Sequence, residues 1–143
     1  MRIYLDNCCF NRPFDNQIPI RIKLETEAKL YIQEEVINGS IELVWSYILE
    51  YENSQNPFEY RRNAINLWKK IATIKIIEDE EILLLAKDLI LFGIKSKDAL
   101  HVACAIKSNC NFFLTTDDLL IKKLSDYNKI RIMNPLEFIM NRG

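Results

Sequence analysis

The chain has 143 residues, of which 49% are hydrophobic and 27% charged, enough for the core of one folded domain that we expect to span residues 1–143. Nineteen basic and twenty acidic side chains give a net charge of −1, which excludes a uniformly basic surface that binds nucleic acid by charge alone. The three glycines form no phosphate-binding loop motif, and the four cysteines and one histidine show no zinc-binding or disulfide pattern.

Five short runs rich in Ile, Val, Leu and Phe alternate along the chain with longer segments of helical period. This alternation is typical of an α/β fold with a parallel sheet, in which helices connect successive strands. The predicted strands are residues 2–5, 41–45, 73–77, 111–115 and 130–133.

Between these strands, apolar residues recur at steps of three and four, and capping residues mark where helices begin and end. The first predicted helix covers residues 24–36 and ends at Asn38-Gly39. Ser46 is expected to cap a short helix, which Pro57 separates from the next element. Later helices are predicted over residues 64–72, from Asp79 to Gly93 and from Ser96 to Ser108.

Acidic side chains occur where the carboxyl ends of the predicted strands should meet. Asp6 follows the first strand directly, and Asp117 comes shortly after the fourth. Asp98 lies in the first turn of a predicted helix, and Glu50 and Glu52 lie in the short helix after the second strand. Because parallel strands end at one edge of a sheet, we expect these acids to gather in one crevice.

Such a cluster of acids has a defined chemistry. Carboxylates about 5 Å apart repel each other by roughly 3 kcal/mol per pair at an effective dielectric constant near 20, and a bound cation relieves that repulsion. Oxygen ligands favour hard ions such as Mg²⁺ or Mn²⁺. These ions activate water for attack on a phosphodiester and neutralise the charge that develops on the phosphate. The acids therefore indicate phosphodiester hydrolysis.

Each of these acids also has an ordinary structural interpretation. Asp98 can complement the positive end of its own helix, and Asp117 or Asp118 can cap the helix that follows them. Glu50 and Glu52 are two positions apart, so they cannot both face the crevice from one helix. The spacing alone leaves these alternatives open.

Four segments of the chain, taken in order, resemble the PIN domains, a family that includes the VapC-type ribonuclease toxins of toxin–antitoxin modules. The segments are YLDN at residues 4–7, SYILEYENSQNP at 46–57, KDALHVA at 97–103 and FLTTDD at 113–118. The resemblance covers essentially the whole chain. It implies a three-layer α/β/α sandwich with a central, mainly parallel sheet of four to five strands, and metal-dependent endonucleolytic cleavage of RNA.

The same resemblance implies roles for individual residues. The catalytic acids that it indicates are Asp6, Glu52, Asp98 and Asp117, and the ligands of Mg²⁺ or Mn²⁺ among them are Asp6, Asp98 and Asp117. Glu52, rather than Glu50, matches the second acid of the family by its distance from Ser46.

Further residues are expected to assist the site, namely Asn7, Thr116 and Asp118. Asn7 stands where the family often has a hydroxyl residue, and its amide can hydrogen-bond a carboxylate or a metal-bound water. Thr115 shares the expectation for Thr116, although β-branched residues are ordinary at a strand end. His101 lies three positions after Asp98, and a packed structural histidine is favoured there over a proton-transfer role.

The resemblance also implies partners: an RNA substrate, an antitoxin protein that holds the enzyme silent, and a second copy in a homodimer. Lys97 and Arg12 adjoin the expected catalytic segments and are candidates for phosphate contacts, although such side chains are usually just solvated. The cysteine usage and the lack of a long apolar run predict a cytoplasmic protein with no membrane partner. The alternative function is a non-catalytic PIN-fold module for interaction or nucleic-acid binding.

Overall fold

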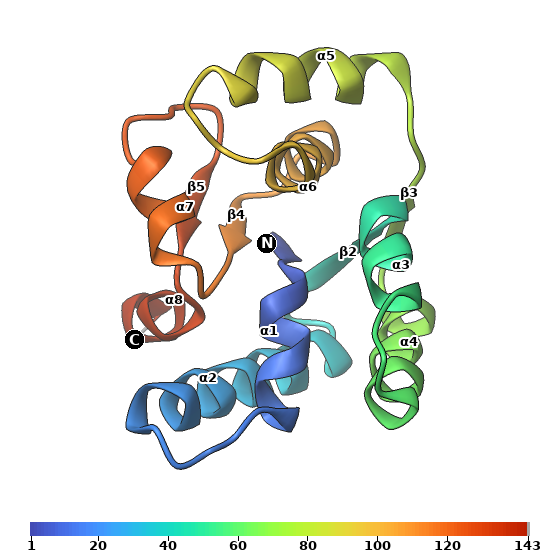
Figure 1. Ribbon diagram of the computed structural model, residues 1–143. Helices are drawn as coiled ribbons and strands as arrows, with labels where there is room; N and C mark the ends of the chain where they lie inside the picture. Colours follow the sequence, from blue (N-terminus) through green and yellow to red (C-terminus); the bar gives the residue numbers. More distant parts are fainter. Residues whose placement is uncertain (143) are drawn as a thin grey trace.

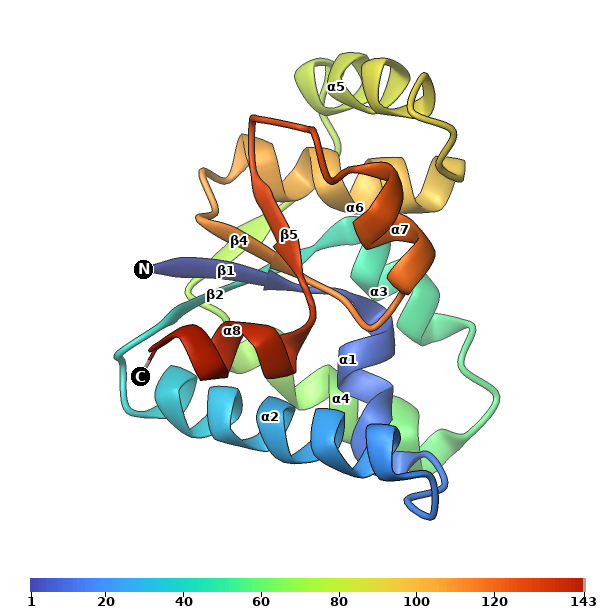
Figure 2. The same ribbon diagram turned by 90° about the vertical axis from the view of Figure 1, so that its left-hand side faces the viewer.

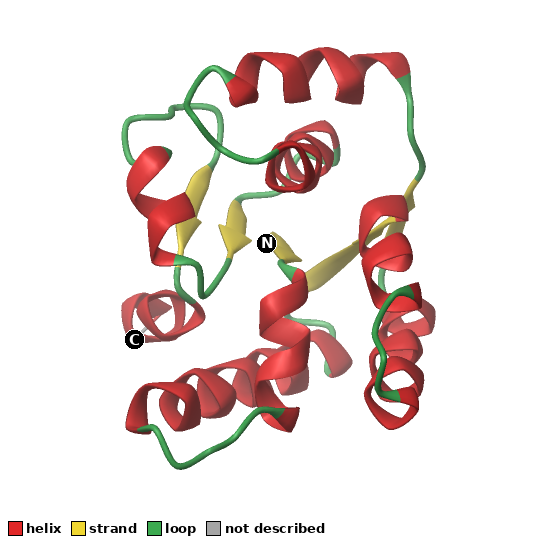
Figure 3. Cartoon of the chain, in the orientation of Figure 1, coloured by secondary structure: helices red, strands yellow, loops and turns green. Residues whose placement is uncertain are grey.

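A computed structural model describes residues 1–142 and contains a parallel sheet of five strands (Figure 1). Their order across the sheet is β3-β2-β1-β4-β5, so the first strand lies at the centre, between β2 and β4. The strands, drawn in yellow in Figure 3, are β1 (Arg2–Leu5), β2 (Glu42–Ser46), β3 (Ile74–Ile76), β4 (Phe112–Leu114) and β5 (Arg131–Met133). The predicted fold class and the five predicted strands are confirmed.

The central strands consist of continuous apolar runs because both faces of the sheet are covered. Ile3 and Tyr4 of β1 are fully buried, as are Leu43 and Val44 of β2. Phe113 of β4 stacks on the Tyr4 ring, with centroids 5.2 Å apart and an interplanar angle of 11°. The parallel register, with Tyr4 paired to Val44 and to Phe113, aligns the three strands with one another at the sheet edge.

Helices pack on both faces of the sheet, as the three-layer prediction requires (Figure 2). One face is covered by α6 with α5 outside it, and the opposite face by α2, α8 and α4. The helices are α1 (Asn7–Asn11), the 3₁₀ turn η1 (Arg12–Phe14), α2 (Ile20–Ile37), α3 (Tyr47–Ser54), α4 (Glu59–Ile71), α5 (Glu80–Ile90), α6 (Ser96–Lys107), α7 (Asp118–Lys123) and α8 (Pro135–Arg142). Among residues 1–142, none of these helices combines the length and apolar character needed to cross a membrane.

The expected capping residues define the ends of several helices. The Ser46 hydroxyl accepts a hydrogen bond from the Leu49 amide at 3.2 Å, and Asp79 caps α5 in the same way. Gly39 and Gly93 adopt φ angles of 85° and 83°, the left-handed conformation that closes a helix.

Two short helices were not among the predicted elements. Asp6 caps α1, which follows β1 without a loop, and α8 begins at Pro135 directly after β5. Neither has enough turns for an apolar period to be visible in the sequence, and α8 is held by packing against α2 (Figure 2).

The carboxyl ends of β1, β2 and β4 lie at one edge of the sheet, because these neighbouring strands are parallel. From this edge β1 leads to Asp6 and α1, β2 leads to α3, and β4 leads to α7. Figure 2 shows α1, α3 and α7 at this edge, opposite the end marked N. The fold therefore brings the predicted acidic segments together.

Candidate functional site

Asp6 lies at the centre of the carboxyl edge and is 7% exposed. Its Oδ1 accepts a hydrogen bond from the backbone amide of Asn7 at 2.8 Å, which caps α1. Its Oδ2 accepts a hydrogen bond from the Thr115 hydroxyl at 2.8 Å. Both oxygens are therefore oriented by neighbours, and the side chain has little freedom to turn away.

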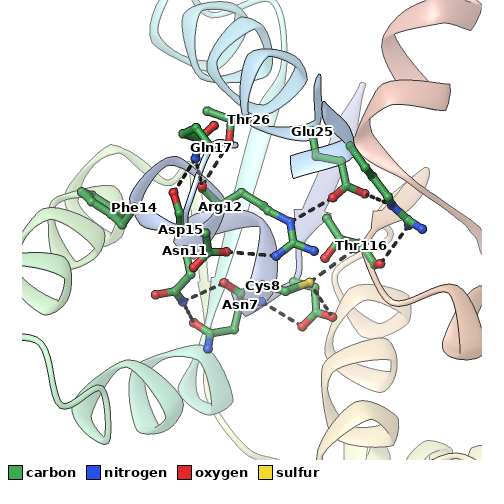
Figure 4. A network of polar contacts seen from close by, with 12 residues as sticks. Asn7, Cys8, Asn11, Arg12, Phe14, Asp15, Gln17, Glu25, Thr26 and Thr116 are labelled. Atoms are coloured by element: carbon green, nitrogen blue, oxygen red, sulfur yellow. Dashed lines mark hydrogen bonds and ion pairs between the residues drawn. The ribbon is translucent and has the colours of Figure 1, made fainter. Parts of the chain in front are cut away.

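Thr115, rather than Thr116, supports the acids. Besides donating to Asp6, the Thr115 hydroxyl accepts a hydrogen bond from the backbone amide of Asp117 at 3.1 Å. The Thr116 side chain is buried and makes no hydrogen bond within the described residues, whereas its backbone amide donates to the Cys8 thiol at 3.4 Å (Figure 4). Successive side chains on extended backbone point in opposite directions, so only one of the two threonines can reach Asp6.

Glu52 faces the site and Glu50 does not. One oxygen of Glu52 contacts Nε2 of His101, and the other accepts a hydrogen bond from the Asn7 side-chain amide at 3.4 Å. Glu50 instead accepts from the Trp45 indole at 2.9 Å and pairs with Lys69 at 3.3 Å. Burial raises the pKa of Glu52, but the hydrogen bond from His101, with the nearby Lys97 charge and the Asn7 amide, leaves that pKa below its ordinary value.

Asp98 lies half-buried in the first turn of α6. Burial raises the pKa of Asp98, and the negative charges of Asp6, Asp117 and Glu52 raise it further. The fold thus brings Asp98 within electrostatic reach of the other predicted catalytic acids.

Asp117 caps α7, so its ordinary interpretation is confirmed. Its Oδ1 accepts hydrogen bonds from the backbone amides of Leu119 at 3.0 Å and Leu120 at 3.2 Å. Asp118, predicted as an assisting residue, is exposed and forms a two-pronged ion pair with Arg21 at 2.5 and 2.7 Å. Because Arg21 engages both oxygens of Asp118, that carboxylate has no free oxygen directed at the other acids.

His101 is fully buried and hydrogen-bonded, as the structural interpretation expected. Its contact with Glu52, and a distance of 4.0 Å between Nε2 and Asp6 Oδ1, place it beside two of the acids. Sequence reasoning did not assign it to the site. The available signal was the three-residue spacing from Asp98, which puts both side chains on one side of α6.

The two basic candidates for phosphate contacts differ in their surroundings. Arg12 donates to Glu25 and to Asp15, each at 2.9 Å, within a polar network between η1 and α2 (Figure 4). Its charge is therefore used inside the protein. Lys97 is exposed and lies 5.7 Å from the centroid of the Tyr51 ring. Of the two, Lys97 alone remains available to a ligand.

The donor chemistry of the site fits a divalent cation. Within residues 1–142, no lysine or arginine forms an ion pair with Asp6, Asp98 or Asp117. However, no group of three or more His, Cys, Asp and Glu side chains in that range lies close enough together to hold a metal ion. An open set of carboxylate oxygens suits Mg²⁺, which takes one or two carboxylates and completes its shell with water.

Comparisons with known proteins support the architecture. The PIN domain family model matches residues 3–125. A chain of VapBC-1 from nontypeable Haemophilus influenzae has a TM-score of 0.63 and 18% identity, and the match covers 94% of this chain and 98% of that one. A chain of VapBC2 from Rickettsia felis, solved bound to a promoter DNA fragment, has a TM-score of 0.62, 16% identity and the same coverage, 94% and 98%. No curated protein gives a significant match.

Proposed function

Because the chain belongs to the PIN domain family, we propose that it is a metal-dependent endoribonuclease that hydrolyses phosphodiester bonds of RNA. The observation that carries this proposal is the position of Asp98. Asp98 is half-buried, and the negative charges of Asp6, Asp117 and Glu52 act on its carboxylate. Among the described residues it forms no ion pair with a lysine or arginine. An uncompensated group of acids destabilises the fold unless a cation is part of the working protein.

Asp6 and Asp98 are the proposed main ligands of Mg²⁺ or Mn²⁺, and Asp117 completes the site through the oxygen that does not cap α7. A bound ion would lower the pKa of its water and stabilise the negative charge of the transition state. Asp6 is held in place by Thr115 and by the first amide of α1, so its carboxylate needs no rearrangement on binding.

Glu52 is the proposed residue that orients the attacking water. It is held by His101 on one side and Asn7 on the other, and its carboxylate can accept the proton of a water that lies between it and the scissile phosphate. Asn7 thus supports two acids: its side-chain amide donates to Glu52, and its backbone amide donates to Asp6.

A surface cavity of about 370 Å³ adjoins Glu52 and offers a path for the RNA strand. Its lining combines the amides of Asn7, Asn11 and Asn56 with the ammonium of Lys97. The Arg61 guanidinium also lines it but pairs with Asp15 at 3.1 Å. Side-chain amides can hydrogen-bond base edges, and lysines bind phosphates. Because the net charge of −1 gives the protein no uniformly basic surface, RNA binding needs a local contact of this kind.

Cleavage of single-stranded RNA by the purified protein tests the proposal. We expect cleavage in Mg²⁺ or Mn²⁺, none in EDTA, and a loss of at least about 100-fold in Asp6→Asn and Asp98→Asn. Activity that survives in EDTA, or in both variants, would contradict the metal site. A non-catalytic module, the alternative function, would show neither cleavage nor a rise in melting temperature on addition of Mn²⁺.

We further propose that the chain is the toxin of a toxin–antitoxin module, held silent by an antitoxin protein. The support is the shared fold with chains of two VapBC structures, matched over 94% of this chain. Expression of the chain alone should arrest growth, and co-expression of the product of an adjacent gene should restore it. Growth unaffected by the active chain would contradict the toxin role while leaving the nuclease proposal intact.

Sedimentation of the purified chain tests the expected homodimer.

A further inference from the structure

A buried chain of hydrogen bonds runs from the end of β2 to Glu52. The Ser46 hydroxyl lies 2.5 Å from the Tyr4 hydroxyl, which lies 2.6 Å from Nδ1 of His101. The opposite ring nitrogen of His101, Nε2, contacts Glu52. The first three of these residues have no exposed surface. The chain therefore connects β2, β1 and α6 to the acid proposed to orient water.

With a neutral imidazole, the donors and acceptors along this chain fit one arrangement of protons. An imidazolium would reverse it, with Nδ1–H donating to the Tyr4 hydroxyl and that hydroxyl donating to Ser46. A carboxylate can only accept, so Nε2 of His101 must donate to Glu52. In a neutral imidazole Nδ1 is then an acceptor, and the Tyr4 hydroxyl donates to it. The Tyr4 oxygen accepts in turn from the Ser46 hydroxyl, whose oxygen accepts from the Leu49 amide at 3.2 Å.

Packing holds the rings in this arrangement. Tyr4 stacks on Phe113, and its ring meets the His101 ring edge-on, with centroids 5.6 Å apart and an interplanar angle of 70°. Because Tyr4 and His101 are both fully buried, rotation of either ring would break a hydrogen bond and leave a buried polar atom without its partner. The Nε2–H group is thereby directed at Glu52, with Asp6 Oδ1 4.0 Å away.

We propose that His101 is a positioning residue, locked in the Nε2–H tautomer by Tyr4 and Ser46, which holds Glu52 in its working orientation. For its catalytic consequence this inference rests on the proposed nuclease function. His101 itself touches no substrate, because it has no exposed surface and does not line the cavity that Glu52 lines. Tyr4 acts indirectly: its hydroxyl hydrogen-bonds Nδ1 of His101 and so fixes the tautomer of the imidazole.

The chain has a single histidine, so ¹H–¹⁵N spectra of the imidazole can be read without ambiguity. We expect a protonated Nε2 and an unprotonated Nδ1 in the wild-type protein, and a displaced Nε2 resonance in Glu52→Gln. A proton on Nδ1, or an Nε2 resonance that Glu52→Gln leaves unmoved, would overturn the inference. Both results are independent of any enzymatic activity.

Tyr4→Phe removes the hydroxyl that fixes the tautomer and leaves the ring in place. We expect both tautomers in its spectrum, a kcat for RNA cleavage about 10-fold lower, and an unchanged KM. The matched control is Tyr47→Phe, which removes a buried hydroxyl with no hydrogen bond in the described chain. Equal kcat values for the two variants would overturn the positioning role.

Two replacements of His101 distinguish the effect of its N–H donor from the effect of the space that its ring fills. Gln places an N–H near the position of Nε2, so His101→Gln should retain more of the wild-type kcat than His101→Leu, which removes the donor. Equal losses in both variants, with melting temperatures alike, would contradict positioning by the N–H group. If the wild-type chain cleaves no RNA, the nuclease proposal fails, and the imidazole spectra still decide between the hydrogen-bond arrangements.

Discussion

The hydroxyl of Thr115, at the end of β4, donates to Asp6 Oδ2, at the end of β1, across a gap of 109 positions in the sequence. The parallel register that pairs Tyr4 with Phe113 and Leu5 with Leu114 makes this contact possible. The same hydroxyl accepts the amide of Asp117. One threonine therefore aligns two of the proposed metal-binding acids.

Thr115→Val should weaken the site without unfolding the protein. The variant keeps the β-branched shape and loses both hydrogen bonds, which we expect to cost about 1–3 kcal/mol of folding stability and about 10-fold in Mn²⁺ affinity. Urea denaturation and calorimetric titration with Mn²⁺ measure the two effects. Thr116→Val is the control, since the Thr116 side chain makes no hydrogen bond in the described residues; equal losses in both would assign the effect to packing.

Glu52→Gln and Glu50→Gln distinguish the two glutamates of α3. We expect Glu52→Gln to reduce kcat by about 10²-fold or more, because an amide cannot take up a proton from the attacking water. Glu50→Gln should retain activity and lose no more than about 1 kcal/mol of stability, since its partners are Trp45 and Lys69. Rates under single-turnover conditions measure the chemistry, and an inactive Glu50→Gln protein would refute the assignment.

Asp98→Asn should change stability in opposite directions with and without metal. In EDTA the variant removes a carboxylate that is half-buried and repelled by Asp6 and Asp117, so we expect a gain of about 1 kcal/mol. With Mn²⁺ the wild-type melting temperature should rise and that of Asp98→Asn should not. Thermal denaturation under both conditions is the measurement, and a wild-type protein indifferent to Mn²⁺ would argue against the site.

Lys97→Gln should weaken RNA binding more than it affects cleavage of bound RNA. Loss of one phosphate contact is expected to reduce the salt dependence of log K by roughly one unit of slope and to raise KM with little change in kcat. Binding measured over a series of salt concentrations gives the slope. Lys95→Gln is the matched control, because Lys95 is exposed nearby and does not line the cavity; equal slopes for the two variants would exclude a specific role for Lys97.

Lys29 of α2 makes folding stability depend on alkaline pH. Its ammonium lies 5.4 Å from the Phe10 ring and 5.2 Å from the Trp68 ring, and burial lowers the pKa of Lys29 to about 8. Between that value and the ordinary value of 10.5 the unfolded chain binds more protons than the folded one, so stability should rise with pH across this window. Below pH 8 the buried charge should cost on the order of 1–3 kcal/mol, partly offset by the two rings.

Lys29→Met should therefore stabilise the protein at pH 7 and remove the rise in stability between pH 8 and 10. Urea denaturation at a series of pH values measures both effects. The control is Lys23→Met, at an exposed position of the same helix, which should leave the pH profile unchanged. A Lys29→Met protein with the wild-type profile would show that another group is responsible.

The strands of this fold could be predicted closely from the sequence, each end falling within one residue of the observed boundary. Their apolar runs are continuous because both faces of the sheet are covered, and that signal is local. The starts of two helices were predicted late, since α2 begins at Ile20 and α4 at Glu59. Exposed first turns of this kind carry no apolar period.

The positions of Asp6 and Asp117 beyond the ends of parallel strands could be predicted, but the contacts around them could not. Asp6 and Asp117 follow strand ends, a position that the sequence reveals. The roles of Thr115 and Thr116 depend on the direction of each side chain beyond β4, and the pairing of Asp118 with Arg21 joins residues 97 positions apart. Such contacts are set by tertiary packing, which no local pattern records.

The parallel pairing of β1 with β4 has a consequence for the synthesis of the chain. A nascent polypeptide that ends before Asp117 lacks one of the proposed ligands, and until β4 has paired with β1 the Asp6 carboxylate lacks its Thr115 support. The proposed site therefore forms by tertiary pairing of two segments 109 positions apart, and neither segment can assemble it alone.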